Sequence, residues 1–145
     1  LMRVFRPGKT VYSLLEASLI RRLNGEDSPV TRTLAAVKSS AAGSNMKELK
    51  SKGRKLLHGI DRKKAFIVES TATTGGGSSP DESFPSLSVC INGGGPAEQT
   101  LRLLREATPP IIGTISEDRV HLNLATIQNE EIPHVRTRLQ HLLGG

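Results

Sequence analysis

Residues 87–124 read LSVCINGGGPAEQTLRLLREATPPIIGTISEDRVHLNL, and this stretch decides the fold. It opens with residues 87–91, in which apolar and small polar side chains alternate strictly, a pattern that predicts a β-strand. Three glycines follow, and Pro96 stands where it can occupy the first position of a helix. Apolar residues then recur at helical spacing as far as Leu104. The stretch therefore predicts a strand followed by a helix.

The second half of the same stretch predicts a β-hairpin. Two short apolar runs, residues 111–115 and 120–124, are separated by Glu117-Asp118, which suits a tight turn between antiparallel strands. Beyond them Asn129 is expected to cap a helix, because two glutamates stand in the first turn and an apolar stripe continues after them. That stripe consists of Ile132, Val135, Leu139 and Leu142.

Helices predominate before this stretch. Apolar residues with a period near 3.6 predict helices over residues 10–23 and 45–59, and Ser28-Pro29 supplies a helix start for residues 29–42. Residues 65–69 are short and rich in β-branched side chains, so they predict a further strand. The expected fold class is α+β, a two-layer small domain with helices packed on a short, mainly antiparallel sheet.

Composition excludes several classes of protein. The chain has 145 residues, of which 36% are hydrophobic and 3% aromatic, so one aliphatic core is expected rather than disorder or two full domains. Few aromatics argue against a platform for stacking bases. The lone Cys90 excludes an internal disulfide, and we expect it to be a small buried hydrophobe. No metal site is indicated, and no apolar run approaches the roughly 20 residues of a membrane span.

Basic residues are concentrated in the first half of the chain. The formal net charge is +6, made of +10 in residues 1–64 and −4 in residues 65–145. The densest part runs from Lys47 to Lys64, on the outer face of the predicted third helix. A solvated helix face is the favoured interpretation, and contact with nucleic-acid phosphates is the alternative.

Few residues form a motif that carries chemistry. Gly8-Lys9-Thr10 lacks the preceding glycine of a phosphate-binding loop, and the glycine runs lack dinucleotide-binding spacing. Arg3 and Arg6 remain, since two guanidinium groups three residues apart can hold a small oxyanion. From spacing alone, a pair of solvated arginines is the favoured interpretation.

Three ordered segments resemble bacterial selenocysteine synthase, the L-seryl-tRNA(Sec) selenium transferases. The resemblance spans nearly the whole chain and is weak from about residue 25 to 72. Its segments are Leu1 to Arg6 with Lys9 and Leu15 to Leu19, Gly75 to Ser78 leading to Pro85-Ser86, and Pro110 to Gly113 with Glu117 to Arg119 and Leu122 to Thr126.

The resemblance implies a fold-type I pyridoxal phosphate enzyme in the cytoplasm. Residues 1–24 would be a helix linking to a preceding large domain, and residues 25–145 the C-terminal small domain. The cofactor, pyridoxal 5'-phosphate, would be bound mainly by the large domain, with its lysine upstream of Leu1, so no catalytic residue is expected in this chain and the chain alone should be inactive. Arg3 and Arg6 would bind the oxyanion of the selenium donor.

The same resemblance implies substrates and partners. The enzyme would convert seryl-tRNA(Sec) to selenocysteinyl-tRNA(Sec) with selenophosphate, and it would assemble from dimers into a larger ring without membrane contact. Thr114 and Ala125 stand where the family has arginines, and Thr or Ala cannot replace their charge. Two alternatives therefore stay open: a related fold-type I lyase or transferase with a different substrate, and a non-catalytic basic module that binds RNA.

Overall fold

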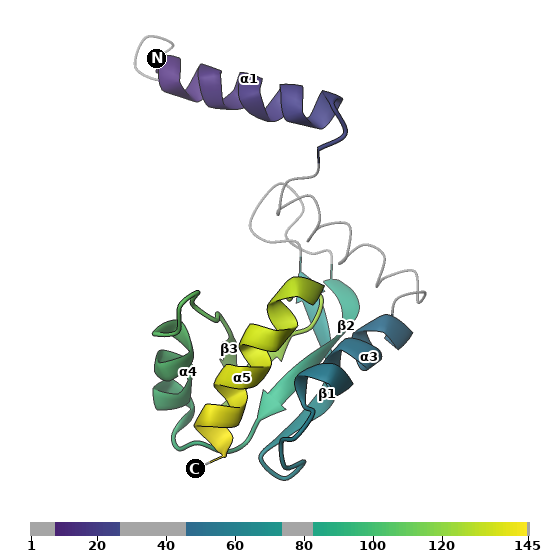
Figure 1. Ribbon diagram of the computed structural model, residues 1–145, viewed down its shortest axis with the longest axis vertical. Coiled ribbons are helices and arrows are strands. Elements are labelled where there is room, and N and C mark those ends of the chain that lie inside the picture. Colours follow the sequence, from purple (N-terminus) through teal and green to yellow (C-terminus); the bar gives the residue numbers. More distant parts are fainter. Residues whose placement is uncertain (1–7, 27–45, 74–82, 145) are drawn as a thin grey trace. The chain divides into compact units, whose positions relative to one another are not determined.

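The computed structural model describes residues 8–26, 46–73 and 83–144 (Figure 1). The chain divides into two compact units between Arg32 and Thr33. The helix expected at 29–42 and the Gly75 to Ser78 run lie outside the described residues.

The described part of the first unit is a single helix, α1 (Lys9–Leu23). It confirms the helix predicted over residues 10–23 and ends where the Asn24-Gly25 pair predicts, with Gly25 at φ +74°. The glycine takes a left-handed conformation that side chains rarely adopt. None of the helix residues is buried. Its exposed large apolar residues are Val11, Tyr12, Leu14, Leu15, Leu19, Ile20 and Leu23.

The second unit contains a four-stranded antiparallel sheet with the order β1-β2-β4-β3. Its strands are β1 (Ala65–Thr73), β2 (Ser83–Ile91), β3 (Thr114–Ser116) and β4 (Arg119–Asn123). The predicted α+β class is confirmed. The first two strands are longer than predicted because they pair along their whole length, from Ala65 opposite Ile91 to Thr73 opposite Ser83.

The predicted hairpin is confirmed, but its first strand begins late. Glu117 and Asp118 have φ of 51° and 56°, the left-handed pair that a tight two-residue turn needs. The strand begins at Thr114 rather than 111 because the Ile111 backbone N–H donates to the Leu104 carbonyl at 3.0 Å instead of pairing in the sheet. A Cβ on Gly113 would lie 2.9 Å from the His121 carbonyl oxygen, so only glycine fits there without a shift.

Three helices cover one face of this sheet (Figure 1). They are α3 (Met46–Leu56), α4 (Ala97–Arg105) and α5 (Ile132–Leu143), the last preceded by the 3-10 turn η1 (Asn129–Glu131). The expected cap at Asn129 is wrong by one residue. Gln128 holds the cap position, and its backbone N–H donates to the Glu131 carboxylate at 2.7 Å.

An aliphatic core lies between the helices and the sheet. Alternate residues of the central strand, Leu87, Val89 and Ile91, point into it, as the strict alternation predicts. Leu56, Leu104 and Leu139 from the three helices are fully buried against them. Among the described helices, none has the length and apolar character to cross a membrane.

Candidate functional site

The two arginines predicted to bind an oxyanion, Arg3 and Arg6, lie outside the described residues. Their role stays a prediction. Within the described residues, the segment that follows β4, residues 124–128, is held in place from two sides. We call it the β4 loop.

From the sheet side, Asn123 fixes the β4 loop with both ends of its amide. Its Oδ1 accepts from the Ser86 hydroxyl at 2.8 Å and from the Ala125 backbone N–H at 3.0 Å. Its Nδ2 donates to the Thr71 carbonyl at 3.3 Å. Because these partners belong to β1, β2 and the loop itself, one side chain ties the end of β4 to two other strands.

From the helix side, Lys52 of α3 holds the same loop. Its Nζ donates to the Leu124 carbonyl at 3.2 Å and to the Ile127 carbonyl at 2.7 Å. Lys52 is 8% exposed. The prediction that the whole basic stretch lies on the outer face of its helix is therefore wrong at this residue. Burial lowers the pKa of Lys52, while the nearby carboxylates, Glu48 first among them, act in the opposite direction.

A pocket of about 400 Å³ lies beside the β4 loop. Its walls are largely apolar, and its polar groups are a threonine, two glutamates and a histidine. His134 Nε2 lies 2.9 Å from the Pro109 carbonyl, which fixes the imidazole at the pocket wall. No lysine or arginine lines it, so the pocket offers no cation to a phosphate or carboxylate. The lining residues are Pro109, Pro110, Ile111, Ile112, Thr126, Ile127, Glu130, Glu131, His134 and Val135.

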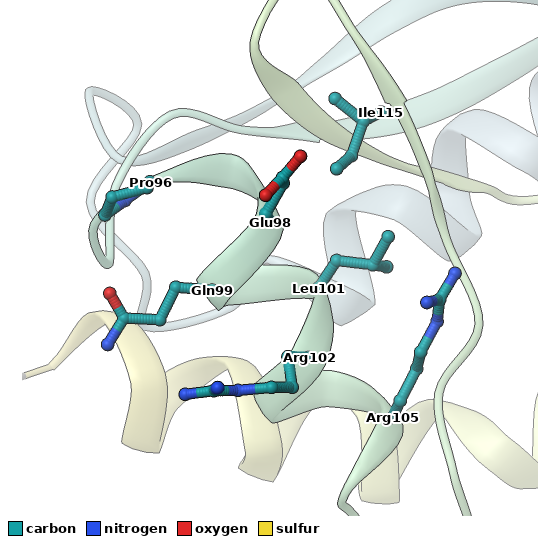
Figure 2. Close-up of a pocket in the computed structure, with 7 residues that line it drawn as sticks. All are labelled: Pro96, Glu98, Gln99, Leu101, Arg102, Arg105 and Ile115. Atoms are coloured by element: carbon teal, nitrogen blue, oxygen red, sulfur yellow. The ribbon is translucent and has the colours of Figure 1, made fainter.

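A second, more open groove lies between α4 and β3, with a volume of about 780 Å³ (Figure 2). Arg102, Arg105 and Glu98 of α4 line it together with Ile115 of β3. Figure 2 shows the two guanidinium groups pointing in different directions, so they do not form a two-armed clamp for one anion. Arg102 Nε also lies 3.8 Å from the Glu106 carboxylate in an exposed pair, which contributes little to stability.

The two positions that differ from the family pattern lie in unlike surroundings. Thr114 opens β3 and is exposed, whereas Ala125 in the β4 loop is 0% exposed. Cys90, in the central strand, is buried as predicted, and burial raises the pKa of its thiol. With Ala125 at the position where the resemblance predicts an arginine, the β4 loop contains no charged residue.

The described residues do not fit a complete pyridoxal phosphate site. Such a site needs a lysine facing a cavity and cationic groups that hold a phosphate. Lys52 is the most buried described lysine, but its ammonium is engaged by two backbone carbonyls. Lys64 lines a small pocket, and its Nζ donates to the Leu143 carbonyl. No step through the cofactor is therefore assigned to the described residues.

The fold and these sites define a small α+β domain whose described residues contain surface pockets and a fixed loop but no self-contained active centre. Comparison with known proteins gives the family. A model of the family described as L-seryl-tRNA selenium transferase matches residues 1–128. This chain belongs to that family.

Individual relatives agree with the family match. The L-seryl-tRNA(Sec) selenium transferase of Aquifex aeolicus is 33% identical over 123 residues, which cover 82% of this chain and 25% of the relative. That of Shewanella oneidensis is 27% identical over 139 residues, 90% of this chain and 28% of the relative. That of Nitratidesulfovibrio vulgaris is 28% identical over 152 residues, which cover 99% of this chain and 31% of the relative. The chain thus spans a quarter to a third of these relatives.

Sequence reasoning missed the two side chains that fix the β4 loop. Lys52 follows the buried Leu49 by three residues and precedes the buried Leu56 by four, which is the spacing of one helix face. That spacing is a signal that distinguishes Lys52 from its basic neighbours. Asn123 gave no comparable signal, because its partners Ser86 and Thr71 are distant in sequence.

Proposed function

We propose that this chain is the C-terminal part of a pyridoxal phosphate-dependent L-seryl-tRNA(Sec) selenium transferase that works in the cytoplasm. The observation that carries the proposal is the family match over residues 1–128, together with an α+β domain that lacks a complete cofactor site among its described residues. The proposed reaction converts seryl-tRNA(Sec) to selenocysteinyl-tRNA(Sec) with selenophosphate. Pyridoxal phosphate supplies the electron sink for such chemistry when bound.

In this proposal each part of the chain has a role beside a large domain. Residues 1–24 link to the large domain, which supplies the lysine for the cofactor, and residues 25–145 form the small domain. Arg3 and Arg6 bind the selenophosphate oxyanion, because a guanidinium fork matches its geometry better than an ammonium does. Dimers assembled into a larger ring are the proposed oligomer. The chain by itself is inactive.

The test uses the full reading frame that encodes this chain. The purified product should show the visible absorbance of lysine-bound pyridoxal phosphate and should transfer selenium to seryl-tRNA(Sec). Replacing Arg3 and Arg6 together by Ala should lower transfer by about 10- to 100-fold through a raised KM for selenophosphate, the loss expected when charge-assisted bonds are removed. Replacing both by Lys should recover part of the loss.

The matched control is the Arg21→Ala, Arg22→Ala pair, which removes the same charge from the exposed end of α1. Transfer by this control should equal that of the wild type. Absence of cofactor absorbance or of selenium transfer in the wild type would contradict the proposed function. Unchanged transfer in the Arg3 and Arg6 variant would contradict only the role of these arginines.

A second candidate is a related pyridoxal phosphate lyase or transferase that acts on a different substrate. The burial of Ala125, at a position where the resemblance predicts an arginine, favours it. A full-length product that shows the cofactor absorbance but leaves seryl-tRNA(Sec) unchanged would support this candidate over the first.

A further inference from the structure

The outer side of α3 carries a stripe of basic residues that the described contacts leave unexplained. Lys47, Lys50 and Arg54 are exposed, and their spacing of three and four residues places them within about 60° of one another around the helix. We call these three residues the α3 stripe. The opposite side of the helix is buried against β2 and α5 (Figure 1). Its buried residues are Leu49, Lys52, Gly53 and Leu56.

No ion pair of the described residues involves the α3 stripe. The ion pairs among those residues are Arg21 with Glu26 and Arg102 with Glu106. Like charges three or four residues apart destabilise a helix. Neighbours in the stripe are about 4.5–6 Å apart along the axis, less than the Debye length of about 8 Å at physiological salt. Their potentials therefore add.

The charge continues beyond the stripe. Lys55 is exposed on the same helix, and Arg62 and Lys63 are exposed in the turn before β1. Between residues 46 and 64 the acidic residues are Glu48 and Asp61 alone. A surface of this composition raises the local concentration of polyanions.

The chemistry of the stripe selects phosphate rather than an apolar partner. No large apolar side chain between residues 46 and 64 is among the exposed ones of the described chain, and no Phe, Tyr or Trp is present there. The stripe can therefore neutralise a row of phosphates, and it offers no Phe, Tyr or Trp on which bases could stack. RNA is favoured as the partner because the relatives are named as acting on seryl-tRNA.

We propose that the α3 stripe contacts the phosphate backbone of the tRNA substrate. This inference rests on the proposed function and adds a location to it: Lys47, Lys50 and Arg54 bind the RNA without reading its sequence. Lys52, which belongs to the same basic stretch, takes no part because its ammonium is buried in the β4 loop. The stripe is a binding surface and takes no part in the chemical step.

The test measures binding of a labelled tRNA(Sec) transcript to the 145-residue chain and to the full reading frame, at several salt concentrations. The stripe variant carries Lys47→Gln, Lys50→Gln and Arg54→Gln. Each lost phosphate contact lowers the slope of log K against log salt by about 1. We therefore expect the slope to fall by about 2–3 and affinity at low salt to fall about tenfold or more. A tRNA of different sequence should show the same loss.

A control variant with the same change in charge separates a local site from net charge. Arg22→Gln, Arg119→Gln and Arg136→Gln lie on α1, β4 and α5, and this control should retain the wild-type slope. Equal weakening in both variants, or unchanged binding in the stripe variant, would overturn the inference. The inference would also be overturned if the stripe variant lost binding to vesicles of phosphatidylserine and phosphatidylcholine but still bound tRNA as the wild type does. That result would assign the stripe to a membrane surface.

The same preparations distinguish this inference from the proposed function. Selenium transfer by the full-length stripe variant at saturating seryl-tRNA(Sec) should equal the wild-type rate, while the KM for the tRNA rises. Wild-type transfer with an unchanged KM would refute the stripe and leave the function standing.

Discussion

At the scale of single residues, Lys52 shows how the surroundings of a charged group decide its role. Six other basic residues between 47 and 63 face solvent, but the Lys52 ammonium lies under the β4 loop and donates to two backbone carbonyls. Burying it costs free energy, and that cost is offset by its hydrogen bonds to two backbone carbonyls. The described acceptors belong to Leu124 and Ile127, which flank Ala125 and Thr126.

Replacing Lys52 by Met tests this balance. Methionine has a similar length and relieves the cost of burying a charge, but it leaves the Leu124 and Ile127 carbonyls without this donor. An unsatisfied buried acceptor costs about 1–3 kcal/mol, so the free energy of unfolding should fall by about that amount. Urea unfolding followed by circular dichroism gives the value. Lys50→Met, two residues away on the exposed side of the same helix, should change it by less than about 0.5 kcal/mol. Equal effects of both variants would contradict the role of Lys52.

The lowered pKa of Lys52 also predicts a pH dependence. Just below the ordinary value of 10.5, the unfolded state keeps a proton that the folded state has begun to release. Stability then rises with pH, because the unfolded state binds more protons than the folded state. The wild type should therefore gain unfolding free energy relative to Lys52→Met as pH increases toward 10.5. Urea unfolding of both proteins at pH 7 and pH 10 measures the difference, and a gap that stays constant or narrows would refute the sign.

At the scale of secondary-structure elements, Asn123 joins three strands at the point where the sheet meets the β4 loop. The Ser86 hydroxyl that it accepts from is 1% exposed. The loop therefore depends on the pairing of β2 with β4, and its conformation follows from the register of the sheet.

Asn123→Ala should lower the free energy of unfolding by about 1–3 kcal/mol, since it leaves a buried hydroxyl and a backbone N–H without their acceptor. Asn123→Asp keeps both acceptor interactions and loses only the donation to the Thr71 carbonyl. Its loss should be smaller, because one of the three hydrogen bonds is removed rather than all of them. Thermal and urea unfolding of the two variants measure the difference. A larger loss for Asp than for Ala would contradict this assignment.

The same elements show what the sequence could predict. Strict alternation in residues 87–91 predicted β2 because its odd-numbered residues point into an aliphatic core, and the Glu117-Asp118 spacing predicted the hairpin. The start of β3 could not be predicted, since it depends on the Ile111 N–H finding the Leu104 carbonyl across a loop. Within the candidate site, the prediction that placed Lys52 on the outer helix face was wrong, although helix spacing carries a signal for its burial. The partners of Asn123 come together only through sheet pairing. Arg3 and Arg6 remain a prediction.

At the scale of the whole molecule, the core belongs to the second unit. Among the residues that the structure describes, all of the buried apolar ones in the core lie between Leu49 and Leu143. The described residues of α1 contribute none. Apolar side chains spread around most of a helix are typical of a helix that is enclosed in a larger protein. This accords with the proposal that residues 1–24 link to a large domain.

A chain that begins at Thr33 should therefore fold as stably as the second unit of the full chain. Removing residues 1–32 takes away no core residue that the structure describes, so the free energy of unfolding of residues 33–145 should match that of the full chain within about 0.5 kcal/mol. Far-ultraviolet circular dichroism during urea unfolding measures both. Tyr12 is the sole tyrosine and the chain has no tryptophan, so its fluorescence reports on α1 alone. In the full chain this signal should change independently of the main transition. A loss of more than about 1 kcal/mol on truncation, or coincident transitions of the two signals, would show that the units fold together.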